Sequence, residues 1–385
     1  MRYKFTSVIL IAAALLFTLT GCAGQTQSSE TLQADTGSIA ESPAETVQAE
    51  QEAETTAPDT QSAGSAEKFN IGHLPATGHI LYFIAQEEGF YQEEGLDVTL
   101  TQFDNNPAEL AALESGKIDV APINATNLIS FLGSGHQITS IGGVMSDGHA
   151  LVVAPEVVEG VDPEDYSLEL LKGKTIILQA GSTYDIEFRK ALTDAGFDLE
   201  KDITILTADS GTSAYNSLKN KEIDGAAVYA PFRQKAIDEG FVPLLYCDEI
   251  EYFDHPICCR DVGLTENIEQ NSEKFKAFTK AMIRAGEFLE NNHAGAVKDA
   301  KKYLDMDEKL LEGEIYNHSV NNPDPDRKKT ETFYHAMDEL GYITNPVNIT
   351  DYINSTIYEE ALQELLDESP DNAYYQYLKT YHENA

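Results

Sequence analysis

From residue 68 onward, short apolar runs alternate with segments whose apolar residues recur every three or four positions. Short runs rich in β-branched residues predict strands, and the longer period predicts helices. The expected strands are 69–74, 97–101, 118–123 and 138–144, and the expected helices between them are 80–88 and 108–114. This alternation predicts an α/β fold with a largely parallel sheet.

The same order of elements recurs further along the chain. The second set has expected strands at 175–179, 203–207 and 225–229 and expected helices at 184–195 and 213–218. Two short matches pair Gly95-Leu96-Asp97 with Gly196-Phe197-Asp198, and Leu113-x4-Ile118-Asp119 with Leu218-x4-Ile223-Asp224. Because both matches occur in the same order, they predict two similar lobes rather than one long domain.

A helical region is expected after the second lobe. A strand at 256–263 leads into a segment with one apolar helical face, formed by Phe275, Phe278, Met282, Ala285 and Leu289. Such a stripe is typical of a helix that packs on a core. Further packing helices are expected at 307–318, 328–340 and 353–368.

The N-terminus has the pattern of an export signal. Arg2 and Lys4 precede an apolar run at 8–19, which is shorter than the roughly 20 residues of a membrane span. Cys22 follows Gly21, so the segment resembles a bacterial lipoprotein signal whose cleavage leaves Cys22 lipidated. An ordinary secretory signal with an incidental cysteine is the alternative.

Composition limits what the chain can do. The 65 acidic residues against 26 basic ones give a formal net charge of −39, which excludes nucleic-acid binding and docking on an anionic membrane through a basic patch. Residues 23–66 contain no aromatic residue, Lys or Arg and eight acidic residues, so a solvated tether is expected there. The three cysteines beyond Cys22 are too few for a disulfide framework.

Several motifs carry a family resemblance. They are Ile84-Ala85-x3-Gly89-Phe90-Tyr91-x2-Glu94-Gly95-Leu96-Asp97-Val98, Leu113-x2-Gly116-x-Ile118-Asp119, Leu171-Lys172-Gly173-Lys174-Thr175-Ile176, Gly181-Ser182-Thr183 and Ile223-Asp224 through Tyr229-Ala230-Pro231-Phe232. In this order they resemble the nitrate/sulfonate/taurine class of ABC-transporter substrate-binding proteins, which also includes binders of thiamine-precursor pyrimidines. The likeness covers residues 69–295.

The resemblance implies a type II periplasmic-binding fold, with two doubly wound lobes around a ligand cleft and a helical C-terminal region. The chain should cross between the lobes near residues 151–155 and again near 252–260. The implied division is a signal peptide at 1–21, an acidic tether at 22–66, the first part of lobe 1 at 67–153, lobe 2 at 154–251, and the completion of lobe 1 with the C-terminal helices at 252–385.

Ligand contacts in this family come from the loops at strand ends. The matching positions here are Thr77, Gly78, His79, Asn124, Thr126, Gly181, Ser182, Thr183, Asp209, Tyr229 and Pro231. Hydroxyls and N–H groups at Ser182 and Thr183 suit an oxyanion or a polar ring edge. Each Ser, Thr or Asn in this set has the simpler alternative role of capping a helix.

The ligand class stays open at the sequence level. Helix N-termini with Ser182 and Thr183 suit a sulfonate, taurine or nitrate. Five aromatic residues are candidates to stack on a flat heterocycle such as a thiamine-precursor pyrimidine or riboflavin: Tyr82, Phe83, Tyr184, Tyr215 and Tyr229. Helix packing is the alternative role of Tyr82 and Phe83. The resemblance implies a lipid-anchored, monomeric, extracytoplasmic protein that delivers its small-molecule ligand to an ABC permease. A non-transport sensor or an enzyme on the same fold is the further alternative.

No enzyme, metal or cofactor pattern stands out. The sequence lacks Gly-x-Ser-x-Gly, His-Glu-x2-His and a phosphate-binding loop, so a non-catalytic protein without cofactor or bound metal is expected. The adjacent Cys258 and Cys259 are interpreted as structural thiols, with a vicinal disulfide and metal ligation left as alternatives.

Overall fold

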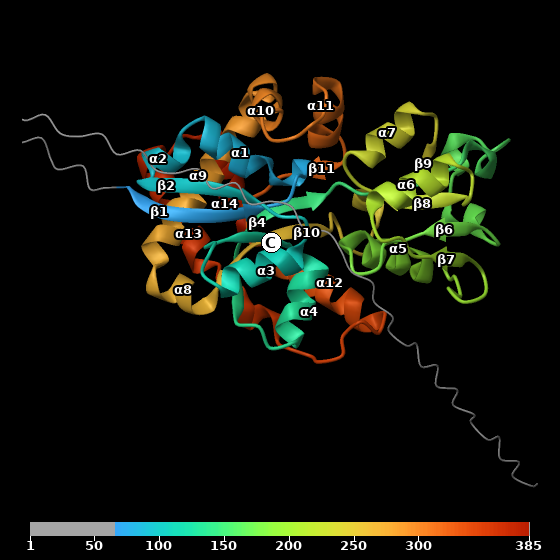
Figure 1. Cartoon of the computed structure of the whole chain (residues 1–385), viewed down its shortest axis with the longest axis horizontal. Helices are drawn as coiled ribbons and strands as arrows, with labels where there is room; N and C mark the ends of the chain where they lie inside the picture. The colour runs from blue at the N-terminus through green and yellow to red at the C-terminus, as the bar shows by residue number, and fades with distance from the viewer. Residues whose placement is uncertain (1–65, 385) are drawn as a thin grey trace, which may run out of the picture. The chain divides into compact units, whose positions relative to one another are not determined.

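The computed structural model describes residues 66–384, which belong to one compact unit, residues 63–385 (Figure 1). The expected signal peptide, Cys22 and the tether up to residue 65 lie outside the described residues. Among the described helices, none combines the length and apolar character that crossing a membrane requires.

The first lobe is built on strands that meet in the order β2-β1-β3-β10-β4. Strand β1 pairs in parallel with β2, and a bridge from Ile71 to Val120 joins β1 to the start of β3. Strand β10 runs antiparallel to β3 and β4, and the short β11 adds to the outer edge of β4. The bounds are β1 (Glu67–His73), β2 (Leu96–Gln102), β3 (Ala121–Asn124), β4 (Ile138–Asp147), β10 (Ile257–Leu264) and β11 (Ser319–Val320).

The second lobe repeats that arrangement. Its five strands have the order β7-β6-β8-β5-β9, with β6 parallel to β7 and β8 and with β5 antiparallel to β8 and β9. The bounds are β5 (Ala150–Val153), β6 (Thr175–Ile177), β7 (Thr204–Leu206), β8 (Gly225–Val228) and β9 (Val242–Tyr246). Each lobe therefore has one antiparallel strand in the fourth position.

One sequence expectation needs correction at the first crossing. The chain leaves the first sheet at Asp147, and Gly148, with a φ of 92°, turns it so that β5 already pairs in the second sheet. The crossing therefore lies at residues 148–149, before the expected 151–155. Residues 150–153, which were expected to end the first part of lobe 1, pair with strands of lobe 2 instead. The other expected domain bounds stay predictions.

Helices cover both sheets and make up the C-terminal region. The expected apolar stripe lies on α9 (Ser272–Asn291), where Phe275, Phe278 and Met282 are buried in the first lobe's core. The other bounds are α1 (Ile80–Glu87), α2 (Phe90–Glu93), α3 (Asn106–Glu114), α4 (Ala125–Gly133), α5 (Thr183–Asp194), α6 (Gly211–Lys219), α7 (Phe232–Asp238), α8 (Thr265–Gln270), α10 (His293–Ala300), α11 (Glu308–Tyr316), α12 (Arg327–Glu339), α13 (Thr356–Glu368) and α14 (Ala373–His382).

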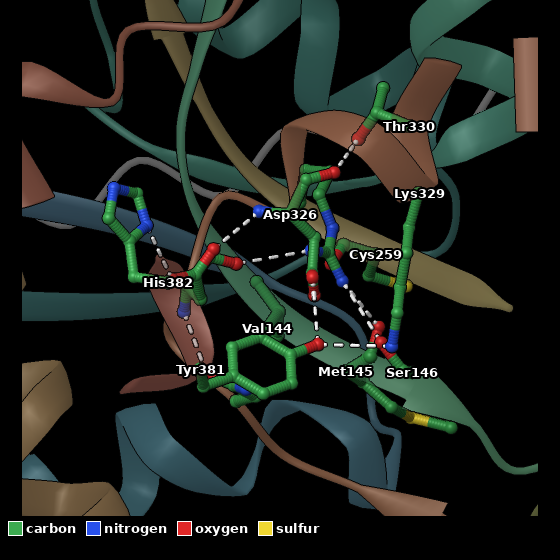
Figure 2. A network of polar contacts seen from close by, with 12 residues as sticks. Val144, Met145, Ser146, Cys259, Asp326, Lys329, Thr330, Tyr381 and His382 are labelled. Carbon is green, nitrogen blue, oxygen red and sulfur yellow. Dashed lines mark hydrogen bonds and ion pairs between the residues drawn. The ribbon is translucent and has the colours of Figure 1, made fainter. Parts of the chain in front are cut away.

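A polar network attaches the C-terminal helix α14 to the segment before α12 and to the first turn of α12. Asp326 accepts a hydrogen bond from the Tyr381 hydroxyl at 2.7 Å, and Lys329 contacts the same hydroxyl at 3.0 Å (Figure 2). Nδ1 of His382 lies 2.7 Å from a carboxylate oxygen of Asp324. Helix α14 is therefore held by polar contacts in addition to the packing of Leu378.

The contact between His382 and Asp324 should make the docking of α14 depend on pH. The hydrogen bond to Asp324 raises the pKa of His382 to about 9. A histidine whose pKa is raised on folding contributes stability fully below about pH 6.5 and loses it as the pH rises through about 9. We expect His382→Gln to lower the free energy of unfolding by about 1 kcal/mol near pH 6.5 and by little above pH 9.5, because the partly exposed pair is screened by solvent.

Urea unfolding at both pH values measures this difference. The matched control is His335→Gln on the exposed side of α12, which should change stability equally at both pH values. An equal loss for His382→Gln at pH 6.5 and pH 9.5 would contradict the charge-dependent contact.

Candidate functional site

A cavity of about 360 Å³ lies where strand ends of both sheets come together. The first lobe contributes the turn after β1, the start of α3 and the junction of β3 with α4. The second lobe contributes the junction of β6 with α5 and the end of β8. The lining residues are Leu74, Ala76, Thr77, Gly78, His79, Asp104, Asn105, Asn106, Pro107, Asn124, Asn127, Met145, His149, Gln179, Ala180, Gly181, Ser182, Thr183, Tyr184, Tyr229, Ala230, Cys258 and Cys259.

Three helices begin at the cavity, and each has a polar N-cap side chain there. Asn105, Asn124 and Ser182 are the N-caps of α3, α4 and α5. Each side-chain oxygen accepts a hydrogen bond from the backbone N–H of the third residue of its helix, at 3.0, 2.8 and 3.2 Å respectively. The capping role that the sequence left as an alternative is therefore present together with the position on the cavity wall. These N-termini direct unpaired backbone N–H groups toward the cavity region.

Asn106 is the central polar side chain of the first lobe's wall. Its carbonyl oxygen accepts hydrogen bonds from the backbone N–H of Asn124 and the side chain of Asn127, both at 3.1 Å. Its amide group donates to the backbone oxygen of Pro122 at 3.1 Å and to Glu109 at 2.6 Å. The residue therefore locks the start of α3 onto the end of β3. Burial raises the pKa of Glu109 to about 8, so this carboxyl group is neutral at pH 7.

The turn after β1 packs tightly on β4. A Cβ atom at Gly78 would lie 2.2 Å from the sulfur of Met145, so a larger residue here would require the Met145 side chain to move. His79 follows, fully buried, and its Nδ1 accepts a hydrogen bond from the backbone N–H of Leu74 at 3.0 Å. Burial lowers the pKa of His79 to about 3. This histidine is therefore a neutral member of the wall.

Two tyrosines form an aromatic wall on the second lobe. The ring centroids of Tyr184 and Tyr229 are 5.7 Å apart, and the Tyr184 hydroxyl donates to Gln179 at 2.5 Å. Burial raises the pKa of both tyrosines, so both are neutral at physiological pH. Neutral aromatic faces of this kind stack on flat ligands.

His149 and Glu187 form a buried pair beside that wall. Nδ1 of His149 lies 2.9 Å from a carboxylate oxygen of Glu187, and both side chains are almost inaccessible to solvent. Burial lowers the pKa of His149, but the Glu187 carboxylate and the nearby thiols of Cys247 and Cys258 outweigh it and raise that pKa well above the ordinary value. The pair therefore favours the protonated form of the His149 ring, while burial raises the pKa of the Glu187 carboxyl group.

The structure brings most of the sequence-predicted residues to this cavity. Thr77, Gly78, His79, Asn124, Gly181, Ser182, Thr183 and Tyr229 line it. The remaining three do not, for separate reasons. Thr126 is buried in the first turn of α4, Asp209 is exposed before α6, and Pro231 is the N-cap of α7 one residue beyond the lining Ala230.

Other lining residues were missed by the sequence analysis. Asn105-Asn106-Pro107 is a recognisable helix start, with an N-cap asparagine and a proline in the first turn, and that signal was available. His149, Cys258 and Cys259 come from the two crossing segments. Their position depends on how the lobes are connected, which no local motif encodes.

A two-lobed α/β molecule with a cavity at the strand ends of both sheets has the fold of periplasmic binding proteins. The aliphatic sulphonate binding protein SsuA of Escherichia coli superposes with a TM-score of 0.65 at 16% identity, over 75% of this chain and 92% of SsuA. The chain belongs to the NMT1-like family, whose sequence profile matches residues 62–303.

Two relatives of this chain differ in the role that their names state: one is a binding protein and the other a synthase. A protein of Brucella abortus (strain 2308) that is assigned a binding role is 28% identical over 237 residues, which are 61% of this chain and 70% of the relative. The 4-amino-5-hydroxymethyl-2-methylpyrimidine phosphate synthase THI11 of Saccharomyces cerevisiae is 24% identical over 256 residues, 63% of this chain and 71% of THI11.

Proposed function

We propose that this protein is the extracytoplasmic solute-binding component of an ABC importer. It captures one small molecule in the cavity between its lobes and delivers it to a membrane permease. The observation that carries the proposal is the cavity itself, which is lined by strand ends and helix starts of both lobes. A ligand that contacts both walls stabilises the closed arrangement, which a permease then recognises.

The lining favours a flat, neutral ligand with hydrogen-bonding edges. Within residues 66–384, no Lys or Arg lines the cavity, and the charged groups on its wall are Asp104 and the His149 ring. The Tyr184 and Tyr229 rings offer stacking faces, and the side chains of Asn105, Asn124, Asn127 and Gln179 offer donors and acceptors. A pyrimidine-like heterocycle matches these groups, and the similarity to THI11 agrees with it.

A small sulfonate or nitrate is the second candidate. The N-termini of α4 and α5 and the positive His149 ring supply partial positive charge, and the similarity to SsuA supports this ligand class. Without an Arg or Lys on the wall, we expect weaker binding of an anion than of a heterocycle.

The cellular location of the protein is part of the same proposal. We propose that Cys22 becomes the lipidated N-terminus, that residues 22–66 tether the binding unit to the membrane, and that the protein acts as a monomer that leaves its transported ligand chemically unchanged. Radiolabelled palmitate incorporation that disappears in Cys22→Ser is the expected result.

A thermal-shift screen of the full chain separates the two ligand classes. Aminopyrimidines and riboflavin form one panel, and taurine, alkanesulfonates and nitrate form the other. Ligand at one hundred times its dissociation constant should add about 2.7 kcal/mol to the free energy of unfolding. The absence of any shift with either panel would count against a capture function for this cavity.

The tyrosine wall gives the matching mutational prediction. We expect Tyr229→Ala to weaken heterocycle binding about 10- to 100-fold, because it removes one aromatic face from the cavity. Titration calorimetry with the ligand found in the screen measures the change. Tyr377→Ala, at a position 53% exposed on α14, is the matched control and should bind as the parent does. Unchanged affinity in Tyr229→Ala combined with a sulfonate hit would favour the second candidate.

A further inference from the structure

Cys258 and Cys259 both line the cavity, although neighbouring residues of a regular strand point to opposite faces. The strand pairing explains this. Ile257 is opposite Ser146 and Cys259 is opposite Met145, so Cys258 is an extra residue of β10 that has no partner of its own on β4. Such a bulge re-aims side chains locally. It brings the two sulfur atoms to 3.1 Å from each other.

The surroundings of the two sulfurs differ. The hydroxyl of Thr183, at the start of α5, lies 3.7 Å from the sulfur of Cys258. Cys259 is paired with Asn124 across β3 and β10. Polar contacts from the second lobe therefore reach Cys258, and Cys259 is held by the first lobe.

We propose that Cys258 and Cys259 form a redox-active dithiol that exchanges with small disulfides entering the cavity. Cys258 is the attacking thiol and Cys259 the resolving thiol. This reaction goes beyond solute capture and does not depend on the identity of the transported ligand. A cavity of about 360 Å³ admits a small-molecule disulfide, whereas a folded protein substrate is excluded.

The electrostatics of the pair support this division of roles. The contact with Cys259 lowers the pKa of Cys258 well below the ordinary value, and the His149 ring and the donating hydroxyl of Thr183 act in the same direction. The same contact raises the pKa of Cys259 well above the ordinary value. The thiolate is the attacking species in thiol–disulfide exchange, so Cys258 is ready to react while Cys259 keeps its proton.

The exchange proceeds in two steps. In the first, the Cys258 thiolate attacks one sulfur of a disulfide R–S–S–R, a bond forms between Cys258 and that sulfur, and one thiolate R–S⁻ leaves. In the second, the Cys259 sulfur attacks Cys258, the bond to the remaining R–S group breaks, and the proton of Cys259 leaves with it as R–SH. The protein loses two electrons as a Cys258–Cys259 disulfide forms, and the small disulfide gains both.

The product should be easy to reduce again. Adjacent residues joined by a trans peptide have Cα atoms about 3.8 Å apart, below the usual range of about 4.4–6.8 Å for disulfides. Strained disulfides of this kind have more oxidising potentials and belong to the labile or catalytic class. The dithiol therefore cycles rather than forming a permanent bridge.

The test uses the folded full chain carrying Cys22→Ser, so that the cysteine outside the described residues does not contribute. The chain is mixed with 2,2′-dipyridyl disulfide, released thiopyridone is followed by absorbance, and the cysteines are mapped by mass spectrometry. We expect two thiols released per chain and a peptide in which Cys258 and Cys259 have lost two hydrogens. Cys247 is the internal control, because it is fully buried and does not line the cavity.

Two variants assign the steps. Cys259→Ser should release one thiol per chain and hold the other as a mixed disulfide on Cys258. Cys258→Ser should react at least about ten times more slowly, because the thiol with the lowered pKa is gone. The proposal is overturned if both cysteines stay reduced in the folded chain, if they react no faster than Cys247, or if Cys259→Ser still releases two thiols.

Discussion

Arg260→Met should lower the free energy of unfolding by about 3–5 kcal/mol. The Arg260 side chain is fully buried at the crossing of β4, β10 and the segment before α12. It donates hydrogen bonds to the backbone oxygens of Cys259 at 2.7 Å, Met145 at 2.8 Å and Asp324 at 3.2 Å. It also lies 3.5 Å from the carboxylate of Asp326. Methionine fills similar space but leaves three buried carbonyl groups without their donor.

Arg260→Met should also destabilise the buried carboxyl group of Asp326. Burial raises the pKa of this carboxyl group and the nearby Arg260 guanidinium opposes that rise, so removing the guanidinium leaves a buried acid without its cation. Asp326 is also the partner of Tyr381 on α14 (Figure 2), so helix docking should weaken with it. Protection of α14 amides from hydrogen exchange should therefore fall in the same variant.

Urea unfolding followed by circular dichroism measures the stability loss. Arg327→Met is the matched control, since Arg327 begins α12 with an exposed side chain and should change stability by no more than about 0.5 kcal/mol. A loss below about 1 kcal/mol for Arg260→Met would mean that water or a shifted side chain satisfies the three carbonyl groups.

Most of the fold was predictable because its signals are local. The helix that becomes α9 has an unbroken apolar stripe, and the strands β2 and β4 are rich in β-branched residues and lie between turns. Strand β9 was missed because Pro243 interrupts its pattern, and proline usually marks an edge strand. Strand β5 was missed because it is a run of only four apolar residues. It forms a strand by pairing with β8 and β9, which are far away in sequence.

The site was predictable to the extent that it is made of strand ends. Asn124 and Ser182 follow strands and open helices, and both line the cavity. Asn106 was missed because its importance lies in three hydrogen bonds to other segments. The bulge at Cys258 was missed for a similar reason, since a register shift between β4 and β10 has no signature within β10 alone.

The two buried histidines of the cavity show how strongly one neighbour decides charge. His79 and His149 are both almost fully buried and both line the same cavity. Burial lowers the pKa of His79 to about 3, whereas the pKa of His149 stands well above the ordinary value. The main difference is a carboxylate, because Glu187 lies 2.9 Å from His149, whereas the hydrogen bonds of the His79 ring go to backbone atoms of Leu74.

Glu187→Gln should therefore remove the charge of His149. Glutamine keeps a hydrogen-bond acceptor at this place but supplies no negative charge. The desolvation of the buried ring then dominates, and the pKa of His149 should fall. Ring-labelled histidine followed by NMR from pH 4 to pH 9 measures the titration directly. We expect a ring that is protonated at pH 7 in the parent chain and neutral at pH 7 in the variant.

Glu169→Gln is the matched control, because Glu169 belongs to an exposed ion pair with Lys172 and should leave the His149 titration unchanged. Circular dichroism checks that Glu187→Gln remains folded. If His149 stays protonated at pH 7 in the folded variant, the carboxylate is not the source of its charge. The thiols of Cys247 and Cys258 would then be the partners that hold the proton, and Cys258→Ser in the Glu187→Gln background should release it.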